Sequence, residues 1–115
     1  MRILVCGGRS YGDITRIAQI LDKIHRERGI TTLIHGGARG ADAIADAWAN
    51  YNNVEREEFC ADWKHLGPRA GPIRNQRMIE DGKPHAVVAF PGGRGTADMT
   101  FRARLAGLPV WEITE

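Results

Sequence analysis

Three clusters of glycine, each with one arginine, are the residues of this 115-residue chain best suited to chemistry. Each cluster directly follows an apolar, strand-like run, and the three read Gly7-Gly8-Arg9, Gly36-Gly37-Ala38-Arg39-Gly40 and Gly92-Gly93-Arg94-Gly95. Glycine lets backbone amides approach a ligand closely, and arginine binds phosphate or carboxylate through two parallel hydrogen bonds. A single Gly-Gly pair usually marks only a tight turn, but three such clusters in one chain predict an anion cradle, with phosphate as the leading ligand.

The clusters lack the signatures of two common nucleotide sites. None has the GxGxxG spacing of a dinucleotide-binding loop, and none ends in the Gly-Lys-Ser/Thr of a phosphate-binding NTPase loop. An NAD dehydrogenase and an ATPase are therefore not supported. A mononucleotide or a nucleotide-derived molecule remains as the expected ligand.

The histidines and cysteines show no metal-binding spacing. The four histidines lie far apart in the sequence, with no HxH or HxxxH pair. Cys6 and Cys60 each end a strand that we predict to be buried, and we interpret both as small core residues. We therefore expect neither a metal nor a cofactor.

Strand and helix patterns alternate along the chain and decide where the clusters lie. The predicted strands are Arg2–Cys6, Thr32–His35, Val54–Cys60, His85–Phe90 and Pro109–Ile113. The predicted helices run from Asp13 to near Gly29, from Ala41 to Tyr51, from Ile73 to Asp81 and from Thr96 to Ala106, with an ordered loop over residues 61–72. Alternation with short connections predicts an α/β three-layer Rossmann-like fold with a five-stranded parallel sheet, and the three clusters would then meet at its carboxyl edge.

Length and composition fit one globular domain over residues 1–115. The chain has a mass of 12.7 kDa, with 43% hydrophobic and 26% charged residues. No apolar run is long enough to span a membrane, and the first residues lack the length of a secretory signal, so we expect a cytoplasmic protein. The net charge of +2 is too small to indicate duplex DNA binding by field alone.

Motifs in three parts of the chain resemble one superfamily. The stretch from Pro91 to Thr96 resembles the PGGxGT motif of the LOG phosphoribohydrolases, which release a base from a nucleoside monophosphate. The stretch from Gly36 to Asp42 is similar to the glycine loop of the DprA/Smf single-strand DNA binders, and both families belong to the SLOG superfamily. The order of Ala61-Asp62-Trp63, Ala70-Gly71-Pro72-Ile73-Arg74-Asn75 and the PGGxGT loop most resembles the YspA-like branch.

The resemblance implies a ligand site built from the three glycine loops and one further helix. Its ligand-binding residues would be Gly7, Gly8, Arg9, Ser10, Tyr11, Gly36, Gly37, Ala38, Arg39, Gly40, Asp42, Asn75, Pro91, Gly92, Gly93, Arg94, Gly95 and Thr96. Trp63 and Tyr11 also fall in predicted loops rather than on helix stripes, so either could stack on a base, whereas Trp48 fits a core or interface position.

The resemblance also implies two catalytic candidates, Arg74 and Asp98. In LOG enzymes a glutamate three residues beyond the motif's threonine pairs with an arginine from the preceding helix. Here that glutamate position is Met99, with Asp98 adjacent, and either Arg74 or Arg77 could supply the arginine, Arg74 being nearer the loop. Arg74 stands at the predicted start of a helix, where the dipole disfavours a cation, so we favour a ligand role for it. Asp98 and Asp42 each stand in a predicted first helical turn, where a carboxylate is equally well explained by the dipole.

We therefore predict a protein that binds a nucleotide or nucleotide-derived molecule, with N-glycosidic cleavage as the reaction if it is an enzyme. The alternatives are a sensor or sequestering module that holds the ligand intact, and a DprA-like single-strand DNA binder, which is not favoured. A homodimer is expected because apolar residues cover too much of the last predicted helix for one buried face. These residues are Ala97, Met99, Phe101, Ala103, Leu105 and Ala106.

Overall fold

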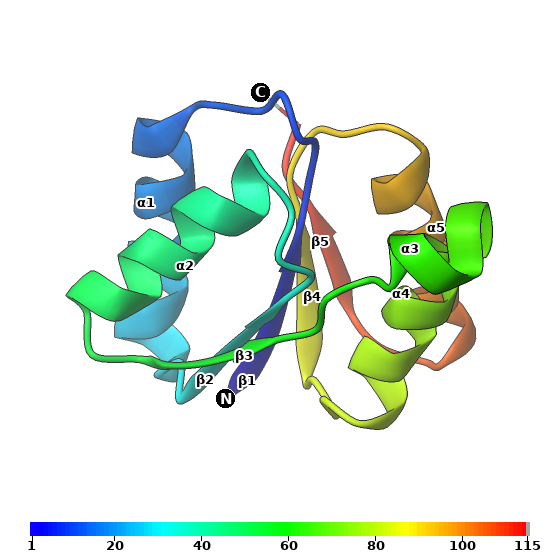
Figure 1. The fold of residues 1–115 in the computed structure, drawn as a ribbon. Helices are drawn as coiled ribbons and strands as arrows, with labels where there is room; N and C mark the ends of the chain where they lie inside the picture. Colours follow the sequence, from blue (N-terminus) through cyan, green and yellow to red (C-terminus); the bar gives the residue numbers. More distant parts are fainter. Residues whose placement is uncertain (115) are drawn as a thin grey trace.

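A five-stranded parallel sheet forms the centre of the protein (Figure 1), whose computed structural model describes residues 1–114. Its strands are β1 (Arg2–Cys6), β2 (Thr32–His35), β3 (Glu55–Glu58), β4 (Ala86–Ala89) and β5 (Val110–Glu112). They lie in the order β3-β2-β1-β4-β5, and every neighbouring pair is parallel. The predicted α/β three-layer Rossmann-like fold is confirmed.

Helices cover both faces of the sheet. On one face lie α1 (Ile14–Arg28) and α2 (Ala41–Tyr51). On the other lie α3 (Trp63–Leu66), a 3-10 turn (Gly67–Arg69), α4 (Ala70–Glu80) and α5 (Arg94–Leu105). The cap of α1 is the one expected, because the Asp13 carboxylate accepts from the backbone N–H of Arg16 at 3.0 Å.

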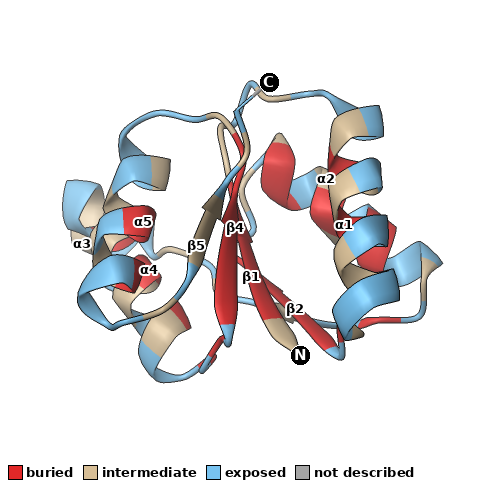
Figure 2. Ribbon diagram, turned by 180° about the vertical axis from the view of Figure 1, so that it is seen from behind, coloured by how far each residue is buried: buried red, intermediate tan, exposed pale blue. Residues whose placement is uncertain are grey.

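The central strands β1, β2 and β4 are largely buried (Figure 2), and their alternate residues belong to two hydrophobic cores. In β1, Ile3 and Val5 belong to the core beneath α1 and α2, whereas Leu4 and Cys6 belong to the core beneath α4 and α5. All four are buried, as expected for a parallel strand covered on both faces. Burial fixes the register of the sheet, and with it the position of the loops at its carboxyl edge.

Two predicted helix starts were wrong. Residues 61–72, predicted as a loop, hold α3 and the 3-10 turn, and α4 begins at Ala70. The helix can include Pro72 because the first-turn N–H groups need no intrahelical partner. Since α5 begins at Arg94, neither Arg74 nor Asp98 lies in a first helical turn, and the dipole arguments made for them do not apply.

The edge strand β3 is shorter than predicted, which corrects the interpretation of Cys60. β3 ends at Glu58 and is largely exposed, as its charged sequence predicts. Cys60 lies beyond the strand and is exposed, with its Sγ donating to Glu58 Oε2 at 2.9 Å. Cys6 alone of the two is a core residue.

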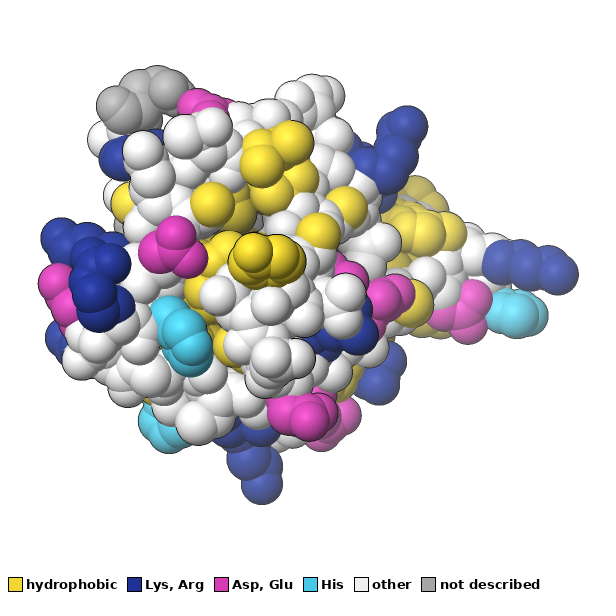
Figure 3. Space-filling model, turned by 90° about the vertical axis from the view of Figure 1, so that its left-hand side faces the viewer, with side chains coloured by type: hydrophobic (Ala, Val, Ile, Leu, Met, Phe, Trp, Pro, Cys, Tyr) yellow, Lys and Arg dark blue, Asp and Glu magenta, His cyan; other side chains and the backbone are white. Residues whose placement is uncertain are grey.

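Hydrophobic side chains also reach the surface. Those on the face formed by α1 and α2 include Ile14 and Tyr51, which border a shallow groove (Figure 3). On α5, Met99 and Ala103 are buried, whereas Phe101 and Leu105 are 61% and 74% exposed. The homodimer stays a prediction.

Within residues 1–114, no helix has the length and apolar character needed to cross a membrane.

Candidate functional site

A cavity of about 630 Å³ opens at the carboxyl edge of the sheet. It lies where the strand order reverses, because β1 is followed along the chain by β2 on one side, whereas its other neighbour is β4. The loops after β1, β2 and β4 line one part of the cavity, and α3 and α4 line another. Parallel α/β sheets bind ligands at this position.

The three glycine loops pack against one another around the cavity. The Gly8 N–H donates to the carbonyl of Pro91 at 2.9 Å, and the Gly8 carbonyl accepts from Ala41 N–H at 3.2 Å. Gly40 has a φ of 74°, and a Cβ there would collide with the carbonyls of Gly8 and Arg9. A Cβ on Gly92 would meet the Thr96 hydroxyl and the Gly8 nitrogen. These glycines therefore serve first to join the loops.

Gly93 and Gly95 have a different environment. Both line the cavity, and a Cβ at either would meet no atom of residues 1–114 within 4 Å. Gly93 is the N-cap of α5, and no side chain caps this helix. The first-turn N–H groups of α5 can therefore bind an anion, favoured by the helix dipole.

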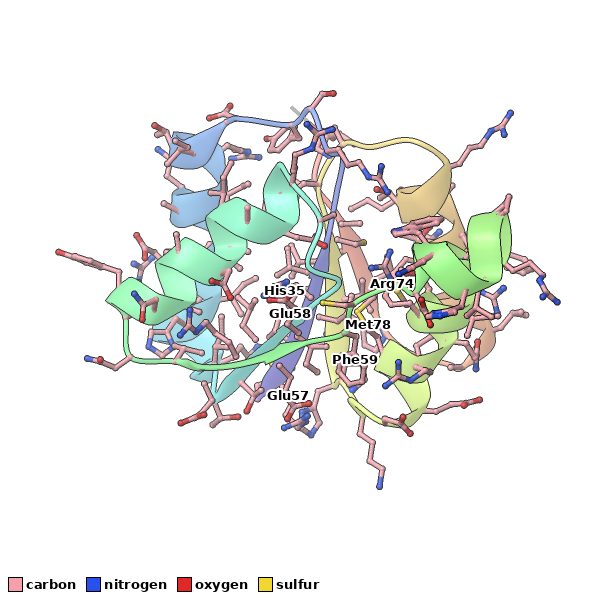
Figure 4. The ribbon with its side chains drawn as sticks, in the orientation of Figure 1. His35, Glu57, Glu58, Phe59, Arg74 and Met78 are labelled. Atoms are coloured by element: carbon pink, nitrogen blue, oxygen red, sulfur yellow. The ribbon has the colours of Figure 1, made fainter. Side chains whose placement is uncertain are left out.

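Arg74 projects from α4 toward the glycine loops (Figure 4). Its Nη1 donates to the Gly36 carbonyl at 2.6 Å, and its Nε donates to Asn75 Oδ1 at 2.9 Å. A Cβ on Gly36 would lie 2.5 Å from Nη1, so only glycine permits this approach. Nη2 has no hydrogen-bond partner within residues 1–114 and remains available to a ligand. Burial lowers the pKa of Arg74, an effect that Asp42 opposes and Arg9 reinforces.

Asp42 lies buried in the wall of the cavity. Its Oδ2 accepts from the backbone N–H groups of Gly36 at 3.1 Å and Ala38 at 3.3 Å. Burial raises the pKa of this carboxyl, although both hydrogen bonds and the nearby His35 and Arg74 work in the opposite direction. Asp42 stands in the first turn of α2, as predicted, and its two hydrogen bonds also order the second glycine loop.

Asp98 also lines the cavity, but its Oδ2 is already engaged. It accepts from Asn75 Nδ2 at 3.0 Å and from Arg102 Nε at 2.8 Å. Met99, at the position of the LOG glutamate, is 1% exposed and packs in the core beneath α4 and α5. The acid-base group that the resemblance implies therefore has no counterpart at Met99.

The charges around the cavity favour an anion. Arg9, Arg74 and Arg94 line it, and the two acids are Asp42 and Asp98. Asp98 is paired with Arg102, while burial disfavours the charged form of Asp42. The balance is positive, and the arginines suit phosphate.

Most of the predicted site residues meet at this cavity. Those that line it are Gly7, Gly8, Arg9, Gly36, Ala38, Asp42, Arg74, Asn75, Gly93, Arg94, Gly95, Thr96 and Asp98. Those that do not are Ser10, Tyr11, Gly37, Arg39, Gly40, Pro91 and Gly92. The Tyr11 ring instead stacks on Phe90 in the core, with ring centroids 5.7 Å apart.

Of the two aromatic residues that could stack on a base by their place in the sequence, Trp63 lines the cavity and Tyr11 does not. Trp63 has no helical stripe to bury it, because its segment is polar and rich in glycine and proline. Met78, Pro68, Gly71 and Pro72 complete the wall on the α4 side. Nothing in the sequence pattern distinguished these residues from ordinary packing.

A cluster of His35, Asp46 and Glu58 lies beside the second glycine loop (Figure 4 labels the first and last). Their ligand atoms lie within 4.8 Å of one another, a spacing that could hold a metal ion. However, His35 Nδ1 accepts from the Gly37 N–H at 3.0 Å, which places the proton of a neutral ring on Nε2, 2.8 Å from Asp46 Oδ1. The imidazole therefore has no free lone pair, and it anchors the loop as a hydrogen-bonded bridge.

Fold and cavity together define a Rossmann-like α/β domain with a cavity lined by glycine loops at the carboxyl edge of its sheet. The chain belongs to the YspA, cpYpsA-related SLOG family, whose family model matches residues 1–65. The Gene 61 protein of Mycobacterium phage D29 is 41% identical over 117 residues, covering 95% of this chain and 93% of that protein. The expected membership of the YspA-like branch is thereby confirmed.

A solved structure shares the fold. The UDP-GlcNAc 2-epimerase of Neisseria meningitidis, determined with UDP-GlcNAc bound, matches with a TM-score of 0.62 at 16% identity. The match covers 98% of this chain and 32% of the epimerase, so the chain spans about a third of that protein's length.

Proposed function

We propose that this chain binds a nucleotide or a nucleotide-derived small molecule in the cavity at the carboxyl edge of the sheet. The observation that carries the proposal is the convergence of the uncapped N-terminus of α5 and the Arg74 guanidinium on one positively charged cavity. Membership of the SLOG family supports a nucleotide-related role. The cavity, at about 630 Å³, lies within the size range of small-molecule sites.

In this proposal the phosphate lies at the start of α5, held by Gly93, Gly95 and Thr96, with Gly92 shaping the turn behind them. Arg74 contributes Nη2 to the phosphate, while Nη1 keeps the guanidinium in place through Gly36. The ribose lies near Asp42.

We further propose that the ligand is held intact, as in a sensor or sequestering module. Asp98 shares one oxygen between two donors, and Met99 supplies no acid. Cleavage of the N-glycosidic bond is the second candidate. It is favoured by one observation: Arg74 and Asp98 both line the cavity and both bond to Asn75, at opposite ends of its amide.

Calorimetric titration of the protein with a nucleoside monophosphate and with the matching nucleoside tests the binding proposal. We expect the phosphate to contribute most of the affinity. Arg74→Ala should lower the affinity for the nucleotide about 10-fold or more, because it removes a charge-assisted hydrogen bond. Arg104→Ala is the matched control, since Arg104 lies on α5 but pairs with Glu112 outside the cavity. Equal affinity for nucleoside and nucleotide, or an Arg74→Ala variant that binds normally, would contradict the proposal.

We also propose that the chain acts as one nucleotide-binding domain that forms a homodimer through the exposed Phe101 and Leu105 of α5. Sedimentation of the wild type and of Phe101→Asp tests this. We expect a dimeric wild type and a monomeric Phe101→Asp variant. A monomeric wild type would contradict the proposed homodimer.

A further inference from the structure

Trp63 is the one aromatic side chain, within residues 1–114, that lines the cavity. It is the first residue of α3, and its 46% exposure contrasts with the 7% exposure of Trp48 in the core. The Asp62 side chain caps α3 by accepting from His65 N–H at 3.3 Å. A short capped helix therefore presents this indole to the cavity.

Gly71 of α4 leaves room for the indole ring to pack against this helix. A Cβ on Gly71 would lie 3.0 Å from Trp63 Cη2, closer than ordinary van der Waals contact, so glycine lets the ring pack against α4 without a shift. Gly71 itself is buried beneath the ring. The ring is thus supported by α4 on one side and accessible on another.

The Arg9 guanidinium lies over the Trp63 ring. Its Cζ lies 5.5 Å from the centroid of Trp63, a cation–π contact that joins the loop after β1 to the segment after β3. Arg9 makes no hydrogen bond or ion pair within residues 1–114. The ring contact is therefore its main restraint, and an aromatic ligand can displace it at small cost.

We propose that Trp63 is the platform on which the base of the nucleotide stacks, replacing Arg9, which then turns to the ligand's phosphate. This inference rests on the proposed function and assigns the base-binding part of the same cavity. The ligand class is a nucleotide with a planar base. Stacking contacts the face of the base and not its hydrogen-bonding edge, so the site binds different bases with little discrimination.

Affinities for AMP and for ribose 5-phosphate separate the base from the sugar phosphate. We expect Trp63→Leu to lower the affinity for AMP about 10-fold, in the range for loss of one base–aromatic stack. The affinity for ribose 5-phosphate should not change. Trp63→Phe, which keeps an aromatic ring, should recover much of the AMP affinity. AMP should also quench the indole fluorescence of the wild type but not that of Trp63→Phe.

Trp111→Phe is the matched control, because Trp111 also has an arginine, Arg28, 5.7 Å above its ring but lies outside the cavity. It should keep both the AMP affinity and the quenching. Wild-type protein that binds neither AMP nor ribose 5-phosphate would overturn the proposed function and this inference together. Protein that binds both, with Trp63→Leu weakening both equally or neither, would overturn this inference alone.

Discussion

The side-chain amide of Asn75 donates from Nδ2 to Asp98 Oδ2 across 3.0 Å, and Asn75 Oδ1 accepts from Arg74. A buried asparagine thus connects the two residues that the resemblance marks as catalytic. Arg102 adds a second donor to Asp98 Oδ2 at 2.8 Å. This arrangement makes Asp98 a brace between α4 and α5.

Asp98→Ala should therefore lower the stability of the fold more than it lowers the affinity for the ligand. The change removes the shorter hydrogen bond of Asn75 Nδ2, which keeps the Gly95 carbonyl at 3.3 Å, and the acceptor of Arg102 Nε, so we expect the free energy of unfolding to fall by about 1–3 kcal/mol. Urea denaturation measures this. Asp81→Ala is the control, because Asp81 and Arg77 form an exposed pair at 3.8 Å and the change should have no measurable effect. An Asp98→Ala variant of normal stability that cannot bind nucleotide would contradict the bracing role.

Asp42 should make the stability depend on pH. Its pKa is raised in the folded state, chiefly by burial, so its contribution to stability is fully present below the unfolded value of 3.8 and is lost as pH rises through the folded value. Asp42→Asn removes this titration. We expect the free energy of unfolding of the wild type, relative to Asp42→Asn, to fall as the pH rises above 3.8 and to level off above the folded pKa. A difference that is constant with pH, or that grows, would contradict the raised pKa.

Gly40→Ala and Gly95→Ala should have opposite effects. The alanine at position 40 would adopt a φ of 74° and collide with the carbonyls of Gly8 and Arg9, so we expect a loss of at least about 2 kcal/mol of stability. The alanine at position 95 meets no atom within 4 Å and lies in a helix, so stability should be unchanged or up to about 1 kcal/mol higher.

Gly95→Ala should nevertheless bind nucleotide more weakly, because Gly95 lines the cavity and its new methyl group would occupy space beside the phosphate. Thermal denaturation and calorimetric titration of both variants measure the two effects. A stable Gly40→Ala variant, or a Gly95→Ala variant with wild-type affinity, would contradict the division between packing glycines and ligand-facing glycines.

The two cysteines should differ in reactivity toward a thiol reagent. Burial raises the pKa of Cys6 to about 12, and the residue is only 7% exposed, so one thiol should react in the native protein and two in denaturant. The hydrogen bond to Glu58 raises the pKa of Cys60, so Glu58→Gln should react faster at neutral pH. Two reactive thiols in the native protein would contradict the burial of Cys6.

Much of the fold could be predicted because hydrophobic periodicity and helix caps act locally. Asp13 caps α1 as expected, and all five strands lie within or beside their predicted ranges. The misassigned segment was 61–72, where glycine and proline indicate a loop by composition. There Asp62 caps a short helix and Pro72 fits the first turn of α4, both of which depend on the geometry of the local backbone.

The site could be predicted as a region, but the role of each glycine could not. Sequence places Gly40, Gly92 and Gly95 in equivalent loops, yet the first two make room for neighbouring backbone or side chain and the third faces open space. That difference depends on contacts between loops far apart in the sequence. Trp63, by contrast, could be predicted as a residue that contacts a base, although the packing of its ring against Gly71 could not.

Native mass spectrometry of the protein with a panel of nucleoside monophosphates, NAD and ADP-ribose separates binding from cleavage in one experiment, because it records bound mass and released base together. We expect an adduct with the mass of an intact nucleotide and no released base. We also expect Arg74→Ala to lose the adduct and Arg104→Ala to keep it. The absence of an adduct with every member of the panel would contradict nucleotide binding, and release of free base would contradict the claim that the ligand is held intact.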